Sequence, residues 1–124
     1  SFGQLFMIHF FTIIKIRDWI DSPYAVSSED GEAIFEVVKG FLEQNLSFTL
    51  DFSDISVLST AFLTSSIGQL SVMFSTDLLN KKVVLIGLDE TKLELIEEVK
   101  LRAKEYSLDP KSIDDLANDA IYGI

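Results

Sequence analysis

The chain has 124 residues, with 20 acidic and 10 basic side chains, a net charge of −10 and no cysteine. This length and a hydrophobic content of 48% are sufficient for one folded domain with a single core. The negative charge argues against binding to nucleic acid, because phosphates would be repelled over most of the surface. Without cysteine there is no disulfide or thiol chemistry, and the single His9 does not make a Cys/His zinc site.

The most apolar run of the N-terminal part is LFMIHFFTII, residues 5–14. It is half the length of a membrane span, which needs roughly 20 residues. No basic residue precedes it, as a secretory signal would require. We therefore expect a buried strand here, no membrane span, and a cytoplasmic protein, which the absence of cysteine also fits.

Hydrophobic periodicity and turn residues predict three strands and four helices along the chain. The strands are expected at residues 9–16, 47–52 and 81–87, the last covered on both faces because it is almost continuously apolar. The helices are expected at about residues 29–44, 60–74, from Thr91 onward, and in a short segment after Ser112. This alternation predicts an α/β fold with a mostly parallel or mixed sheet of about four strands, flanked by helices.

We expect residues 1–124 to form a single domain, because no internal repeat or low-complexity linker divides the chain. Residues 1–6 are interpreted as a leading segment that is either disordered or derived from an expression vector. Residues 110–124 are interpreted as a helical extension at the C-terminus, because Asp109-Pro110 interrupts the preceding helix.

The stretch DFSDISVLSTAFLTSSIGQL, residues 51–70, contains no charged residue after Asp54 and is rich in Ser and Thr. Nucleophilic catalysis by these hydroxyls would need a nearby base, but His9 falls in the first predicted strand. The chain also lacks a Gly-x-Ser-x-Gly elbow and a glycine-rich phosphate loop. We therefore expect a protein without catalytic activity and without a cofactor.

Asp51 and Asp54, at the end of the second strand, raise the question of a magnesium site like that of a receiver domain. Such a site also needs an acidic pair after the first strand and a lysine after a late strand. Asp18 and Asp21 are separated by two residues, and Lys81 and Lys82 precede their strand. We therefore interpret the two carboxylates as part of a turn and expect no metal.

Ser59 and Thr60 lie at the first turn of the predicted helix, where backbone amides and the helix dipole stabilise an added phosphate. The alternative is that one hydroxyl caps the helix, while Thr64, Ser65 and Gly68 allow close packing. Residue chemistry alone favours this second interpretation.

The segment LDFSDISVLSTAF, residues 50–62, resembles the core motif of STAS domains, the sulfate-transporter and anti-sigma-factor-antagonist family. The closer resemblance is to the bacterial STAS-like family of unknown function, with an Asp-Phe strand end followed by a Ser-Ser-Ser-Phe helix start. Residues 22–35 resemble the polar, glycine-containing opening of that family's first helix, and the whole likeness spans residues 13–90.

The resemblance implies a compact sheet flanked by helices and a non-catalytic regulatory role. Anti-sigma-factor antagonists bind a serine kinase of the histidine-kinase-like ATPase fold, and phosphorylation of a serine at the helix start releases this partner. Here the phospho-acceptor position falls on Ala61, which has no hydroxyl, and Phe62 replaces the usual glycine. A phospho-switch would therefore have to use Thr60 or Ser59, and otherwise the domain would bind its partner constitutively.

The predicted function is thus protein–protein interaction, with a histidine-kinase-like ATPase as the expected partner. The expected interaction surface contains residues from the strand end and from the small face of the helix: Asp51, Asp54, Ala61, Thr64, Ser65 and Gly68. The alternative function is sensing of a small molecule or nucleotide, in a pocket between residues 53–58 and the Pro23 turn. The oligomeric state stays open, a homodimer included.

Overall fold

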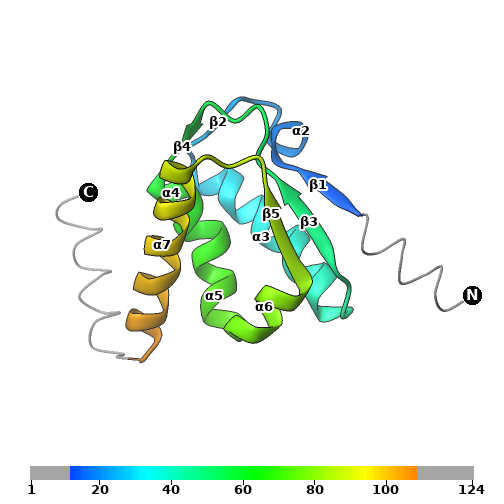
Figure 1. Cartoon of the computed structure of the whole chain (residues 1–124), viewed down its shortest axis with the longest axis vertical. Helices are drawn as coiled ribbons and strands as arrows, with labels where there is room; N and C mark the ends of the chain where they lie inside the picture. Colours follow the sequence, from blue (N-terminus) through cyan, green and yellow to red (C-terminus); the bar gives the residue numbers. More distant parts are fainter. Residues whose placement is uncertain (1–11, 109–124) are drawn as a thin grey trace, which may run out of the picture.

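The computed structural model describes residues 12–108 of the chain (Figure 1). The elements in chain order are β1 (Ile13–Lys15), α2 (Ile16–Ile20), β2 (Tyr24–Ala25), α3 (Ser28–Glu43), β3 (Phe48–Asp51), β4 (Val57–Leu58), α4 (Thr60–Leu63), the π-helix η1 (Thr64–Gly68), α5 (Gln69–Met73), α6 (Thr76–Lys82), β5 (Val83–Ile86) and α7 (Glu90–Leu108). The expectations for residues 1–6, for strand residues 9–11 and for the helix after Ser112 lie outside the described residues.

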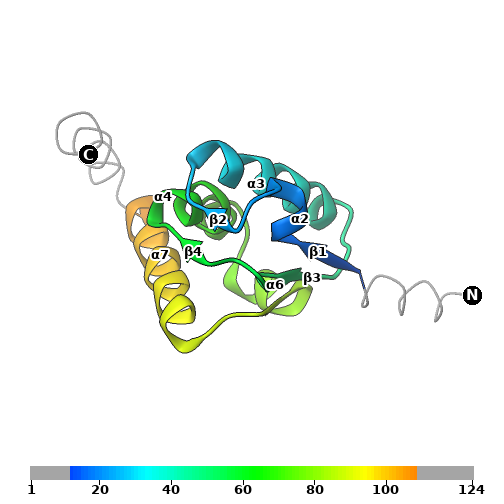
Figure 2. The ribbon, with the colours of Figure 1, turned by 90° about the horizontal axis from the view of Figure 1, so that it is seen from above.

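The strands form two small parallel sheets, which confirms the predicted α/β class. β1, β3 and β5 form a three-stranded sheet in the order β1-β3-β5, and β2 pairs with β4 in a separate two-stranded sheet. In Figure 1, α5 and α7 lie to the left of β3 and β5, and Figure 2 shows α3 and α7 on different sides of the bundle. The connections between the parallel strands run through helices, as parallel pairing requires.

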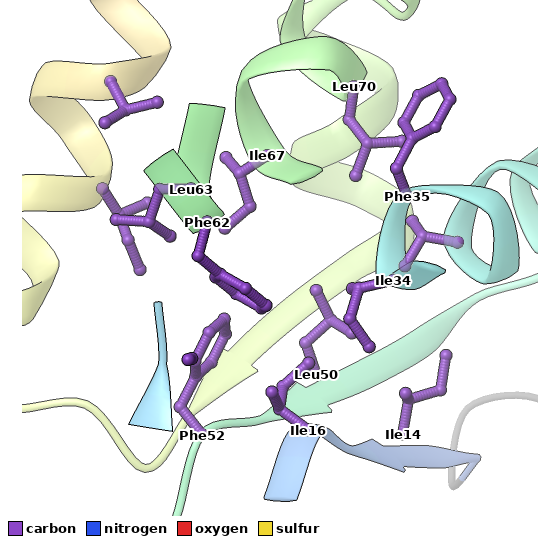
Figure 3. Packing of buried hydrophobic residues seen from close by; sticks show 14 of the residues in the cluster. Ile14, Ile16, Ile34, Phe35, Leu50, Phe52, Phe62, Leu63, Ile67 and Leu70 are labelled. Atoms are coloured by element: carbon purple, nitrogen blue, oxygen red, sulfur yellow. The ribbon is translucent and has the colours of Figure 1, made fainter. Parts of the chain in front are cut away.

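The core lies between the inner face of the three-stranded sheet and the helices. Leu50 from β3 and Ile34 from α3 are almost completely buried, as is Phe62 from α4. Figure 3 shows Phe52, just after β3, and Phe62 pointing toward one another. The segment 60–74, where the sequence predicts a helix, contributes a stripe of apolar residues to this core: Leu63, Ile67 and Leu70 are buried, and Phe74 packs against them.

The prediction that the third strand is covered on both faces was wrong. Val84 and Ile86 of β5 have exposed fractions of 47% and 40%, whereas Val83 and Leu85 pack against the core. Successive side chains of a strand point to opposite faces, and the described helices cover only the inner face. A continuous apolar run therefore does not distinguish a strand buried on both faces from one buried on a single face.

Four short elements were not predicted from the sequence, namely α2, β2, β4 and α6. Lys81 and Lys82 belong to α6, so the third strand begins at Val83 instead of at residue 81. The helix α7 begins at Glu90, and the Asp89 carboxylate caps it by accepting a hydrogen bond from the Lys92 amide at 2.8 Å. The helix expected from Thr91 onward thus begins one residue earlier, after Asp89, whose charged oxygens suit the positive end of the helix.

The hydroxyl groups of residues 64–71 mostly satisfy backbone carbonyls around the π-helix η1. The buried Ser66 Oγ donates to the Phe62 carbonyl at 2.8 Å, and Ser71 Oγ donates to the Ile67 carbonyl at 2.9 Å. Ser65 Oγ donates to the carbonyls of Ala61 and Phe62, at 3.0 and 3.1 Å. A π-turn widens the helix and disturbs the regular bonding pattern. The serine hydroxyls can therefore be packed inside this segment because backbone carbonyls accept their hydrogen bonds.

Gly31 allows α3 to approach the α4–η1 segment closely. A Cβ atom at position 31 would overlap the Ser65 hydroxyl oxygen and the Phe62 carbonyl oxygen. Gly40, nine residues later in the same helix, has no atom within 4 Å of the corresponding position. Only the first of these two glycines is therefore required by packing.

We predict opposite effects for alanine at these two positions. Gly31→Ala should lower the free energy of unfolding by about 1–3 kcal/mol, because the added methyl group meets backbone that has little room to shift. Gly40→Ala should raise it by about 0.5–1 kcal/mol, because alanine restricts the unfolded chain and favours the helix. Urea denaturation of both variants measures the two changes, and a Gly31→Ala protein as stable as Gly40→Ala would contradict the close approach.

Candidate functional site

The carboxyl end of the three-stranded sheet brings several predicted site residues to one end of the molecule. Asp51 is the last residue of β3, and Asp54 lies in the following loop. In Figure 1 this loop leads to β4 and the start of α4 beside β2. The site therefore has two parts, a polar cluster at the strand ends and an exposed helix start.

Asp51 is held by its own loop and by β1. Its Oδ1 accepts a hydrogen bond from the Ser53 amide at 2.8 Å, and its register partner on β1 is Lys15. The Ser53 hydroxyl, followed by the Ser53 amide and the nearby Lys15 charge, lowers the pKa of Asp51 below its ordinary value. The carboxylate therefore fixes the turn after β3.

Gly87, directly after β5, closes this cluster from the other side. Its φ is +76°, a left-handed conformation that favours glycine. A Cβ atom at this position would lie 2.6 Å from Ser53 Oγ and 2.9 Å from Asp51 Oδ1. The end of β5 can therefore approach the Asp51 turn only because residue 87 has no side chain.

Lys15 was not recognised as a site residue from the sequence. Its ammonium group lies 3.2 Å from Asp54 Oδ2, and Asp54 itself adopts a left-handed backbone conformation with φ of 65°. Both side chains are partly or largely exposed, so this ion pair contributes little to stability. The only feature of the sequence that could have indicated Lys15 is its position as a single charged residue at the end of the first apolar run. It lies directly before the helix α2.

The polar cluster offers little for catalysis within the described residues. Asp51 and Asp54 are engaged with Ser53 and Lys15, and residues 12–108 contain no group of three or more His, Cys, Asp or Glu side chains that could hold a metal ion. Because Asp51 and Asp54 are held by these local interactions, they do not form a pair of titratable groups arranged for proton transfer. The expectations of no enzyme activity and no metal stay predictions.

Ser59 serves as the cap of α4. Its Oγ accepts a hydrogen bond from the Phe62 amide at 3.1 Å and donates one to the Val26 carbonyl at 2.7 Å. The hydroxyl therefore both begins the helix and ties it to the chain after β2. Adding a phosphate to Ser59 would remove the bond to Val26, since the oxygen would lose its proton.

Thr60 and Ala61, by contrast, are exposed. The Thr60 hydroxyl has no hydrogen bond to any residue in the range 12–108. Thr64, one turn further along, is exposed as well. The structure thus separates the two predicted hydroxyls: Ser59 has a structural role, and Thr60 is accessible.

Three exposed apolar side chains lie next to this helix start and were not predicted as site residues. Tyr24 of β2 pairs with Val57 of β4, and Val26 is joined to Ser59 by the hydrogen bond described above. We define the helix-start patch as the following exposed residues: Tyr24, Val26, Val57, Thr60, Ala61 and Thr64. The patch carries no charge, although the whole chain carries −10.

Ser65 and Gly68, which the sequence assigned to the interaction surface, face other parts of the chain. Ser65 packs against Gly31 of α3, and Gly68 is buried beside α7, where a Cβ atom would make an ordinary contact of 3.5 Å with the Val99 side chain. The close approach to α3 thus involves Ser65, whereas Gly68 is buried without a comparable steric restriction. The accessible part of the predicted surface therefore consists of Thr64, Ala61 and the acidic loop.

The space between residues 53–58 and the Pro23 turn is bridged by backbone hydrogen bonds. The Ser56 amide donates to the Pro23 carbonyl at 2.7 Å, and the Ser59 amide donates to the Ala25 carbonyl at 3.0 Å. These bonds continue the parallel pairing of β2 with β4. The two segments that were expected to enclose a small-molecule pocket are thus joined directly to each other.

We predict that Ser53→Ala raises the pKa of Asp51 toward its ordinary value, because the hydroxyl is the main cause of the lowering. A carboxylate whose folded pKa is lowered stabilises the fold above its unfolded pKa, and this contribution is lost as the pH falls through the folded pKa. The stability difference between wild type and Ser53→Ala should therefore be present at neutral pH and shrink in strong acid. NMR titration of the Asp51 carboxyl carbon measures the shift, and an unchanged pKa in the variant would disprove the assignment.

We also predict different consequences for removing the two hydroxyls at the helix start. Ser59→Ala should lower the free energy of unfolding by about 0.5–2 kcal/mol, because the cap of α4 is lost. Thr60→Ala should change it by no more than about 0.5 kcal/mol, as is usual for exposed sites. Thermal and urea unfolding of the two variants test this difference, and equal losses would show that Thr60 also supports the fold.

Comparison with known families matches residues 30–93, just over half of the chain, to the family described as a STAS-like domain of unknown function. The match runs from the first turn of α3 to the first turn of α7 and includes Asp51 and the whole helix start. No curated protein and no solved structure matched the chain. None of the helices in residues 12–108 has the length and apolar character needed to cross a membrane. The motif at the end of β3 and the start of α4 thus belongs to a known sequence family, and the chain is a member of the STAS-like domain family of unknown function.

Proposed function

We propose that this chain is a non-catalytic regulatory module that binds a protein partner through the helix-start patch. The observation that carries the proposal is the composition of this patch, which is exposed, half apolar and uncharged on a strongly acidic chain. Uncharged, partly apolar surface costs little to desolvate when a partner covers it. Nothing in the polar cluster offers an equally good alternative, because its groups are engaged locally.

The proposed partner is an ATPase of the histidine-kinase-like fold with serine kinase activity. This part of the proposal is supported by the resemblance of residues 50–62 to anti-sigma-factor antagonists, whose helix start contacts such a partner. The family match includes this segment but describes no function. The helix start presents Thr60 and Ala61 to solvent, as a contact of this kind requires.

If the module is switched by phosphorylation, Thr60 is the proposed acceptor. Its hydroxyl is exposed and is not used by the fold, whereas that of Ser59 makes two hydrogen bonds. A phosphate adds about −1.5 to −2 charges at neutral pH. Placed in the centre of an uncharged patch, this charge would have to be desolvated on binding and would release the partner.

We predict that Thr60→Glu and Val57→Asp each weaken binding of the ATPase at least about tenfold, because each places a charge in the contact. The matched control is Val72→Asp on α5, since Val72 is exposed to a similar degree, 55% against 46%, and lies outside the patch. The measurement is calorimetric titration of the purified ATPase whose gene lies nearest to that of this chain.

Binding that is equally strong with wild type, Thr60→Glu and Val57→Asp would exclude the patch as the contact. Intact-mass analysis after incubation with the ATPase and ATP tests the switch separately. A phosphate that is found on wild type and is absent from Thr60→Ala supports Thr60 as the acceptor. If the ATPase binds but transfers no phosphate, the domain binds its partner constitutively and is not switched by phosphorylation.

A further inference from the structure

The strand β5 forms one edge of the three-stranded sheet. β3 pairs with it on one side, and no strand within residues 12–108 pairs with its other side (Figure 1). The Ile86 carbonyl accepts a hydrogen bond from the Phe52 amide, on the β3 side. Because successive residues of a strand turn their amide and carbonyl groups to alternate sides, those of Leu85 point to the outer edge. This edge therefore presents backbone groups with which a further strand can pair.

The composition of β5 does not protect this edge against pairing. Natural edge strands are commonly very short, carry charged residues or proline, or are covered by another segment. The opposite edge strand, β1, has three residues and ends in Lys15. β5 has the sequence Val-Val-Leu-Ile, which is uncharged and strongly β-forming. Its Val84 and Ile86 side chains are also exposed on the open face of the sheet. We therefore expect another strand to cover this edge.

A hollow lies under this edge, on the helical side of the sheet. Its volume is about 210 Å³, and its apolar walls include Val83 and Leu85 of β5 together with Leu50 and Leu79. The apolar layer beneath the sheet is thus not filled up to β5. Because strand side chains alternate between the two faces, a strand added beside β5 would place every second side chain over this hollow. The added strand should therefore be apolar on both faces, as β5 itself is.

The charges at the two ends of β5 identify the occupant. Lys81 and Lys82 precede the strand and form its basic end, and Asp89 and Glu90 follow it and form its acidic end. In an antiparallel pair of two such strands, the basic end of each lies beside the acidic end of the other, whereas a parallel pair would bring like charges together. Lys81 and Glu90 are exposed, and neither forms an ion pair within residues 12–108. The edge is thus complementary to itself.

We propose that β5 pairs antiparallel with β5 of a second copy, so that the two three-stranded sheets join into one. The two Leu85 residues lie opposite each other at the two-fold axis and exchange both of their backbone hydrogen bonds. In this register Val84 of each copy lies opposite Ile86 of the other on the open face, and each pair covers apolar surface. A two-fold axis uses the same surface of both copies, as in most protein dimers.

Sedimentation of the full chain over a range of concentrations tests this pairing. Wild type should show a reversible equilibrium between monomer and dimer. Lys81→Glu and Glu90→Lys should each raise the dissociation constant of the dimer at least about tenfold, because each replaces an attraction by a repulsion at both pairs of strand ends. The matched controls are Arg17→Glu on α2 and Glu36→Lys on α3, which make the same charge changes away from β5.

An equimolar mixture of the Lys81→Glu and Glu90→Lys proteins distinguishes lost pairing from lost folding. In the mixed dimer, position 81 of each copy lies near an opposite charge at position 90 of the other copy. Dimer formation should therefore return to the wild-type level in the mixture, and the double variant should form a dimer by itself for the same reason. Two weakened single variants that do not recover in the mixture would contradict the pairing of the strand ends.

Hydrogen exchange of the Leu85 amide tests whether the contact lies on the edge of β5. This amide should exchange quickly in dilute protein and slowly in the dimer. The amides of Val84 and Ile86 point to β3 and should stay protected at both concentrations, which makes them internal controls.

Three results would overturn the proposal. The first is a wild-type chain that stays monomeric at millimolar concentration. The second is a dimer that neither Lys81→Glu nor Glu90→Lys weakens, since this dimer would use another surface. The third is protection of the Leu85 amide that does not depend on concentration, because another segment of the same chain would then cover the edge.

Discussion

The contact between Gly31 of α3 and the α4–η1 segment determines how the rest of the domain is arranged. A side chain at position 31 would overlap Ser65 and the backbone of Phe62, so the two helices could not keep their spacing. This spacing seats Phe62 in the centre of the core, where it meets Phe52 at the end of β3 (Figure 3). The helix start that follows β4 is therefore held in a fixed position relative to the sheet.

The same close packing explains why a run of 22 uncharged residues is rich in hydroxyl groups. A π-helix between two α-helices changes the regular pattern of backbone bonds, and the serines of this segment donate hydrogen bonds to backbone carbonyls of the preceding turn. These bonds allow the hydroxyl groups to be buried, whereas a charged residue could not be buried there without large cost. The hydroxyls that point outward, above all Thr60, are left for contact with other molecules.

The described part of the domain exposes apolar side chains in separate places, despite the acidic composition of the chain. The helix-start patch lies beside the start of α4 and carries no charge. Ile13, Val84 and Ile86 lie on the open face of the sheet, which also carries Lys15 and Asp51. The first of these two surfaces has the setting of a partner contact. The acidic charge elsewhere limits unspecific association.

The sequence by itself determined the α/β class, the extent of α3 and the core stripe of residues 60–74, because these depend on local periodicity. It also located the Asp51 turn and the helix start, through residue types that occur together in a short segment. Only the tertiary structure decided which of the two hydroxyls is the cap, that Thr64 is exposed while Gly68 is buried, and that Lys15 and Val57 belong to the site. These properties depend on which segments lie side by side, and parallel pairing joins residues more than 30 positions apart. The exposed face of β5 was not predicted for the same reason, because an apolar run does not indicate which segments of the chain cover it.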